Sequence, residues 1–580
     1  MDRWNFAIAS LGIFFSSFLN PIATHAEKIS EVSPTPLQQE SIDKHYIFYL
    51  LQSQEWKRGI DLYRKYKELL GHHDVEILAQ MAFTLLERIA KSPDHEDQLA
   101  ALFAASLAHV STPLAFINNG FFLHGEPHAQ LAAIHLLGQI QDDRSEFLLL
   151  QAMSSRSLLI RLEAAYQLCM RKAKMAVGHV ESLMHRLPPQ ARSFFPQFFA
   201  LSGTKEAIAI LRQLIDDPDP GTRIETITAV ARFGRDDLLP LIQSAATYAS
   251  PIQQEACAMA FGMLKDYRSL PTLRTFASSP HDTVRLAALS ALFHLGEESA
   301  KAGLFASAKG ENLFAIRLLE DIEGSEDLLV SLLFSKDIHV RFNALLSLLK
   351  RRDPRVTPHL KEFIVCDTKD IGFQPLFSSG GTLQAWKIIG SAEQQANKGI
   401  RDLIPISLHV REQMLRDCVE LPSTAFLEIA HLLLNEGQNA LIPLLVRVLE
   451  MRPSPEVVEL LKKNAQRTGA PLIRTYCQLA LMRMTKNREG EETVLRWIQQ
   501  QKQSEMLRFR PIVPKNALIS RTSQGDSLTH EEHAALLCDA YITLAQNHND
   551  LGIDTLLDGI ATGHPKNRAI LAALLIQAIE

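Results

Sequence analysis

The sequence lacks most features that mark a catalytic, nucleic-acid-binding or disulfide-rich protein. Its 580 residues include six cysteines, none in CxxC spacing, and a formal net charge of −5 gives no basic excess for nucleic acid. The phosphate-binding motifs GxxxxGK and GxGxxG, the nucleophile motif GxSxG and the zinc motif HExxH are all missing. The whole chain is 46% hydrophobic, and leucine and alanine dominate it, a composition that favours helices.

The run HEEH (His530–His533) is the nearest approach to a metal motif. Its glutamates fall where a capping box with Thr529 would begin a helix, and this accounts for them without a metal. We therefore predict no catalytic residue, no cofactor and no metal site.

The N-terminus has the layout of a secretory signal peptide. Arg3 precedes an apolar run over residues 6–19, and an Asn-Pro pair and small residues ending at Ala26 follow it. We predict a signal peptide over residues 1–26, a flexible leader over 27–40, and a mature chain that is periplasmic or secreted. The alternative is an uncleaved anchor, although the run is shorter than the roughly 20 residues that span a bilayer.

The region from 126 to 365 repeats itself at intervals of 31 residues, the separation of Gln254 from Arg285. We call this position of each repeat the anchor. The anchors are Gln130, Arg161, Arg192, Arg223, Gln254 and Arg285, with later copies at Arg341 and Arg474. A fixed period of this size predicts stacked supersecondary units.

Each copy except that of Arg192 holds a small residue three positions after the anchor and a large apolar residue seven positions after it. These positions share one face of a helix, so the small residue lets neighbouring helices approach and the large one fills the core. The small position is held by Ala133, Ala164, Thr226, Cys257, Ala288, Ala344 and Cys477. We therefore predict that Cys257 and Cys477 are buried packing residues, not reactive thiols.

A shorter amphipathic helix precedes each such helix, so every unit is a helix, a turn and a helix. The strings HDTVRLAALSALFHLG (281–296) and KDIHVRFNALLSLL (336–349) resemble the second helix of HEAT repeats, in particular the short phycobilisome-lyase-like type. The resemblance implies an all-α fold, an armadillo-type α-solenoid of stacked repeats. It also implies a hydrogen-bonded ladder between adjacent repeats, with Asp282, Arg285, Asp337 and Arg341 as members.

The rest of the chain carries weaker signals. Residues 41–125 are predicted to form an N-terminal helical cap, and residues 405–580 degenerate helical repeats with an exposed loop over 508–527. Between them, residues 366–404 break the pattern with clustered glycine, serine and aromatic residues. This segment is either an irregular insertion that carries a contact surface or a degenerate repeat.

Two families of enzymes resemble this chain in their repeats. Deoxyhypusine hydroxylase looks similar, but it binds iron through several His-Glu pairs, and this chain has two distant ones, His95–Glu96 and His530–Glu531. Phycobilin lyases share the repeats alone. We predict an exported, non-enzymatic scaffold for protein–protein interaction. The alternatives are a HEAT-framed enzyme or cofactor-handling protein, lyase-like in kind, and a membrane-tethered structural envelope component.

A partner would bind the side of the second helices opposite their apolar face. Positions two, five and nine after the anchor lie there on an ideal helix. The residues that we expect to contact a protein or peptide are Tyr166, Met170, Arg232, Met259, Met263, His294 and Lys350. The alternative is that they touch adjacent helices in a tight superhelix. No nucleic acid is expected, and a membrane only if the N-terminal segment is uncleaved.

Overall fold

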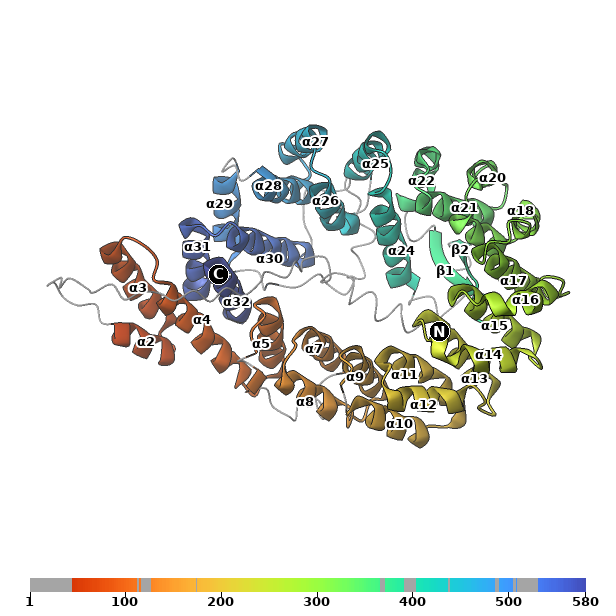
Figure 1. Cartoon of the computed structure of the whole chain (residues 1–580). Coiled ribbons are helices and arrows are strands. Elements are labelled where there is room, and N and C mark those ends of the chain that lie inside the picture. Colours follow the sequence, from red (N-terminus) through yellow and green to blue (C-terminus); the bar gives the residue numbers. More distant parts are fainter. Residues whose placement is uncertain are drawn as a thin grey trace, which may run out of the picture. The chain divides into compact units, whose positions relative to one another are not determined.

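The computed structural model of the chain (Figure 1) describes residues 44–111, 114–115, 127–173, 175–365, 371–390, 403–436, 439–485, 490–503, 507 and 530–580. The predicted signal peptide, leader and 508–527 loop lie outside these residues. The described chain is that of an all-α helical-repeat protein of the α-solenoid class, to which one β-hairpin is added. It divides into two compact units. Unit 1 holds the described residues from 164 to 484, and unit 2 those from 44 to 163, 485 to 507 and 530 to 580.

Unit 1 is built from helix pairs, as the sequence predicts. The predicted shorter first helix is found in most repeats, but in two of them the first helix is the longer one. The second helices are α9 (Leu158–Met170), α11 (Pro196–Ser202), α13 (Pro220–Arg232), α15 (Pro251–Met263), α17 (Asp282–His294), α19 (Leu313–Leu318) and α21 (Ile338–Lys350). The first helices are α10 (Ala176–Arg186), α12 (Lys205–Leu214), α14 (Leu239–Ala246), α16 (Leu270–Phe276), α18 (Ala300–Lys309), α20 (Glu326–Leu332) and α22 (Thr357–Ile364). Further helices follow the hairpin: α24 (Leu403–Cys418), α25 (Ser423–Glu436), α26 (Ile442–Met451), α27 (Pro455–Ala465) and α28 (Pro471–Thr485).

The core follows the repeat positions. All seven residues at the small position, from Ala133 to Cys477, have a relative exposure of 0%. The large apolar position is equally buried in most copies, as at Leu168, Phe261 and Leu348. The predicted packing role of Cys257 is confirmed, and its burial raises the pKa of the thiol to about 12.

The anchor arginine closes the turn between the two helices of its own repeat. Nη1 of Arg223, Arg285 and Arg341 donates to the carbonyl oxygen six residues earlier, at 2.7, 3.0 and 3.0 Å. This bond satisfies a carbonyl that follows the end of the first helix, so the anchor fixes the geometry of the turn. It gives a physical reason for arginine at this position.

Unit 2 is formed by the first and the last helices of the described chain. The early helices are α2 (Lys44–Gln52), α3 (Trp56–Leu70), α4 (Val75–Ala90), α5 (His95–Leu107), α7 (Pro127–Gln139) and α8 (Asp143–Ala152). The late ones are α29 (Glu491–Gln501), α30 (His530–Gln546), α31 (Asp550–Thr562) and α32 (Arg568–Ile579). Helix α32 is apolar on all sides and packs against α4, α5, α30 and α31. The residues predicted as an N-terminal cap thus share a core with the end of the chain.

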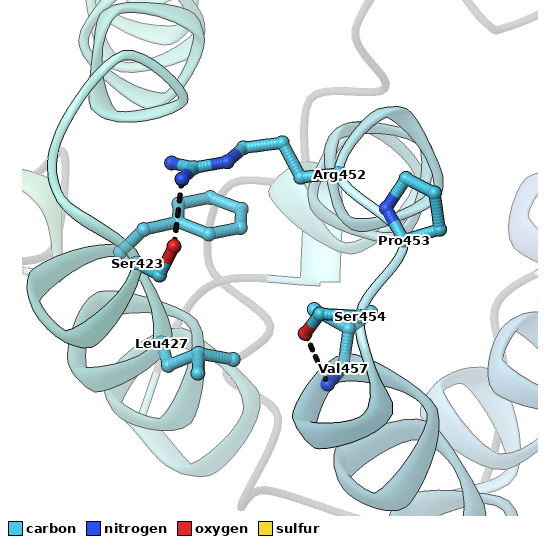
Figure 2. Close-up of a pocket in the computed structure, with 7 residues that line it drawn as sticks. Ser423, Leu427, Arg452, Pro453, Ser454 and Val457 are labelled. Atoms are coloured by element: carbon cyan, nitrogen blue, oxygen red, sulfur yellow. Dashed lines mark hydrogen bonds between the residues drawn. The ribbon is translucent and has the colours of Figure 1, made fainter.

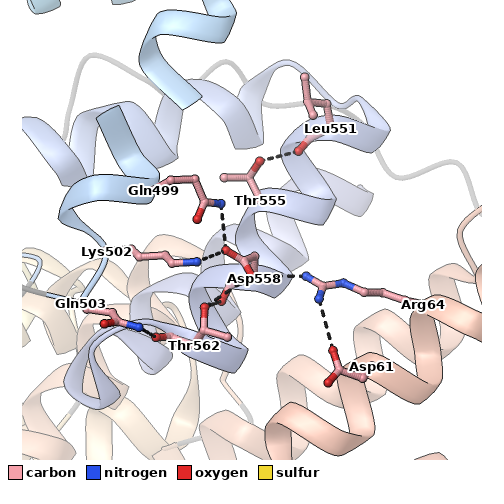
Figure 3. A network of polar contacts seen from close by, with 9 residues as sticks. All are labelled: Asp61, Arg64, Gln499, Lys502, Gln503, Leu551, Thr555, Asp558 and Thr562. Carbon is pink, nitrogen blue, oxygen red and sulfur yellow. Dashed lines mark hydrogen bonds and ion pairs between the residues drawn. The ribbon is translucent and has the colours of Figure 1, made fainter. Parts of the chain in front are cut away.

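Asp558 joins three segments of unit 2 in one polar network (Figure 3). Its carboxylate accepts hydrogen bonds from Lys502 and from Gln499 (2.9 Å), and Arg64 of α3 lies 3.6 Å away. Burial opposes the ionised form, but these partners outweigh it and lower the pKa of Asp558. The network therefore stabilises the packing of α3 and α29 on α31 while Asp558 is ionised.

Candidate functional site

The segment predicted as an insertion or a degenerate repeat contains a β-hairpin that lies on helices of unit 1. Strands β1 (Ile371–Phe377) and β2 (Gln384–Gly390) pair antiparallel, with Pro375 opposite Trp386 and Phe373 opposite Ile388. The pairing of proline with Trp386 is a non-hydrogen-bonded one, so the missing N–H of Pro375 faces away from β2 and costs the ladder nothing.

Helix α21 binds the outer edge of β2 through two polar side chains one turn apart. Asn343 Nδ2 donates to the carbonyl of Trp386 at 2.8 Å, and the N–H of Trp386 donates to Asn343 Oδ1 at 2.9 Å. His339 Nδ1 accepts from the N–H of Ile388 at 2.9 Å. Asn343 therefore makes the pair of hydrogen bonds that a neighbouring strand would make.

Glu255 of α15 holds the turn of the hairpin. Its side chain has a relative exposure of 0% and accepts from the hydroxyls of Ser378 and Thr382 (2.6 Å for Thr382). The N–H groups of Gly380 and Thr382 add longer bonds of 3.3 and 3.4 Å. A Cβ at Gly380 would lie 2.7 Å from the Glu255 carboxylate, so this close approach needs glycine.

Helix α24 covers the edge of β1. Ser407 Oγ accepts from the N–H of Phe373 at 3.2 Å, and Arg411 Nη2 donates to the carbonyl of Ile371 at 3.3 Å. The Arg411 guanidinium also lies 5.1 Å from the centre of the Phe373 ring, which stacks on Phe342 at 4.7 Å. We call Glu255, His339, Asn343, Ser407 and Arg411 the hairpin seat.

The predicted contact residues divide into exposed and covered ones. Met170 and Met263 are 51% and 54% exposed, and Arg232, His294 and Lys350 are exposed too. Tyr166 and Met259, five positions after their anchors, are half-buried. Several positions two after the anchor, among them Ala256, Ala287 and Asn343, are buried. The predicted contact surface is therefore reduced to position nine, at the helix ends, because neighbouring helices and the hairpin cover much of positions two and five.

Among the four residues implied as a ladder, Arg341 joins adjacent repeats, because its partner Glu362 lies on α22, the helix that follows its own repeat. Asp282 pairs with Arg285 of its own helix. Asp337 accepts from the N–H of His339 at 2.8 Å and so caps α21, while Arg341 pairs with Glu362 of α22 at 2.6 Å. Arg285 and Arg341 also reach the turn carbonyls of their own repeats, so each of them closes a turn.

A small pocket lies between α25 and α27 (Figure 2). Its volume is about 190 Å³, below the roughly 300 Å³ at which ligand sites begin. The Arg452 guanidinium at its rim donates to the carbonyls of Val419 and Leu421, both at 2.6 Å, and to Ser423 Oγ at 2.8 Å. Arg452 therefore stabilises the turn between α24 and α25.

Within the described ranges, no group of three or more His, Cys, Asp or Glu side chains is placed to hold a metal ion. The side chains of His530 and Glu531 are not among those that the structure describes. In the same part of the chain, no helix is long and apolar enough to cross a bilayer.

No family model matches the sequence, and no curated protein matches it. Among solved structures, the chain is similar to one in the structure of Kap95p with RanGDP, at 12% identity over 90% of this chain and 79% of that chain, with a TM-score of 0.32. It is also similar to Kap121p, at 14% identity over 91% of this chain and 62% of that chain, with a TM-score of 0.35. The helical-repeat fold rests on the helices and contacts described above.

Sequence reasoning missed the hairpin seat. The alternation of Ile371, Phe373 and Phe377, followed by the small residues of SSGG, is a signal for a strand and a tight turn. No local signal pairs that turn with Glu255, which lies 127 residues before Thr382.

Proposed function

We propose that the mature chain is an exported, non-enzymatic scaffold that binds a protein or peptide partner at the exposed helix ends of unit 1. The observation that supports this is the exposure of Met170 and Met263 at the same repeat position, together with Arg232, His294 and Lys350. Exposed methionines adapt to a partner's shape, and the charged neighbours add polar contacts.

The test is crosslinking of the mature chain in its host, repeated with Met170→Glu and Met263→Glu together. If a partner buries these two methionines, replacing them by carboxylates should abolish the crosslinked partner band, because each charge would be buried without a partner. The matched control is Met451→Glu, since Met451 is 67% exposed on α26, outside the set. A partner band that survives the double substitution, or that Met451→Glu removes equally, would refute the assignment of these helix ends.

Export is tested separately by mass spectrometry of the native N-terminus. A mature chain that starts at Glu27 supports cleavage of the proposed signal peptide. A retained Met1 favours the alternative of a tethered envelope component. Copurification of a metal or a chromophore would favour the enzymatic alternative over the scaffold.

A further inference from the structure

We propose that the packing of α3 on α31 is an acid-sensitive joint of unit 2, which is closed while the His73 ring is neutral and opens when the ring takes up a proton. The two helices pack against each other (Figure 1), and His73 lies in the turn that follows α3. The joint is separate from the exposed helix ends of unit 1, so the two proposals can fail independently.

The His73 ring is almost enclosed between the two helices. Its side chain has a relative exposure of 5%, and Nδ1 lies 3.0 Å from the hydroxyl of Tyr63 in α3. Nε2 lies 3.5 Å from a carboxylate oxygen of Asp554 in α31. Because a carboxylate attracts a proton donor, the neutral ring carries its proton on Nε2 and accepts at Nδ1 from the Tyr63 hydroxyl.

Protonation of the ring would place a second proton in its contact with Tyr63. Nδ1 would become a donor, and the Tyr63 hydroxyl, which already accepts from the N–H of Asp74 at 3.2 Å, would have to turn its own proton away. The Tyr63 side chain has a relative exposure of 0%, so water does not replace the lost acceptor. A charged ring therefore costs the closed joint a hydrogen bond.

The charges around the ring act in both directions. Asp554 and Asp550 of α31 favour the charged ring, while Lys67 of α3 opposes it. Lys67 Nζ lies 2.8 Å from the Asp554 carboxylate, closer than the His73 ring does, so that carboxylate is already paired. Burial, which is the largest cause, and Lys67 together lower the pKa of His73 below its ordinary value of 6.5.

Acid should therefore favour the open joint. Opening exposes His73 and returns its pKa to about 6.5, so the open state binds the proton more strongly than the closed state. The closed state is fully favoured above this pH and loses the advantage as the pH falls towards its own lower pKa. Arg64 and Asp558 also join the two helices, 3.6 Å apart (Figure 3), and the lowered pKa of Asp558 keeps that pair ionised over this range.

The test is hydrogen exchange of the intact chain at about pH 7.5 and about pH 5.5, corrected for the intrinsic exchange rates. Helix α3 has 15 residues and is marginally stable alone, so opening should expose its amides. The open population of α3 should rise by up to about tenfold between these pH values, because the exposed ring titrates near 6.5. His73→Gln should abolish the rise, since a neutral amide does not take up the proton. His72→Gln is the matched control and should keep the rise, because the neighbouring His72 is exposed.

A rise below about twofold in the unchanged chain, or an equal rise in His73→Gln, would overturn the proposal. Loss of the rise in His72→Gln would overturn it too. The amides of α15 and α17 in unit 1 serve as the internal reference, and a loss of protection there as large as in α3 would show general acid unfolding instead of a local joint.

If His73→Gln does not fold, Lys67→Met provides a second test. Removal of the ammonium group leaves Asp554 free to pair with the charged ring, so protonation should cost the closed joint less. The rise in the open population of α3 should then be smaller than in the unchanged chain, and an equal or larger rise is the contrary result.

Discussion

Replacing Asn343 by alanine removes the contact that fixes β2 on α21. The side chain is fully buried and makes two hydrogen bonds with the main chain of Trp386, at 2.8 and 2.9 Å. The helix itself should tolerate the change, because alanine stands at the equivalent positions 256 and 287. Any loss of stability should therefore concern the hairpin and not the repeat.

The magnitude follows from the two main-chain groups that lose their partner. Each buried group left without a hydrogen bond costs about 1–3 kcal/mol. Trp386 is 9% exposed, so water can reach part of the space left by the amide. We expect the free energy of opening the hairpin to fall by about 3 kcal/mol, which corresponds to a roughly 150-fold rise in the open population.

Hydrogen exchange measures this change directly. The N–H groups of Trp386 and Ile388 should lose protection by about that factor, while those within α15 and α17 keep theirs. Lys387→Ala is the control, since the same strand carries this side chain on its exposed side. A change in protection at Trp386 below about twofold would refute the reasoning that Asn343 anchors the strand.

Three further predictions concern other parts of the chain. Leu574 of α32 is fully buried, so Leu574→Ala should lower the free energy of unfolding of unit 2 by about 2–5 kcal/mol, as measured in urea. A decrease below about 1 kcal/mol would show that α32 lies outside the core of unit 2. Lys265→Gly should raise stability by about 0.5 kcal/mol in urea unfolding, because Lys265 has a φ of 54° at a position where two other repeats hold Gly234 and Gly296. A decrease in stability would contradict this strain. Because folding lowers the pKa of Asp558, its ionised carboxylate stabilises the folded state above the ordinary carboxyl pKa. This stabilisation is lost as the pH falls through the pKa of the folded state. In Asp558→Asn, the free energy of unfolding should therefore depend less steeply on pH below about pH 4.

The sequence predicted those parts of the fold that depend on local periodicity. Burial of the small position, as at Cys257 and Ala288, follows from a spacing of three and seven residues along one helix. The exposure of Met170 and Met263 follows from the same spacing, because position nine lies at the helix end. Such positions are set by the helix and its immediate neighbours, which the repeat supplies.

The remaining features depend on contacts between distant segments. Asn343 lies two positions after its anchor, where the sequence predicts a partner contact, and its actual partner Trp386 lies 43 residues further along the chain. Tyr166 and Met259 were expected on an open surface, yet both are half-buried. Period and composition carry no information on which segment covers a helix face, so these residues could not be assigned from the sequence.

The packing of α32 also bears on the order of folding in unit 2. Gln577 donates to the carbonyl of Leu107 at 2.7 Å across 470 residues of sequence, and α32 covers apolar faces of α4 and α5. Contacts this distant in sequence form late, because the intervening chain must be synthesised and its loop closed first. The early helices therefore lack part of their core while the chain is growing. Unit 2 therefore stays incomplete until α32 has been synthesised, which would suit the proposed export.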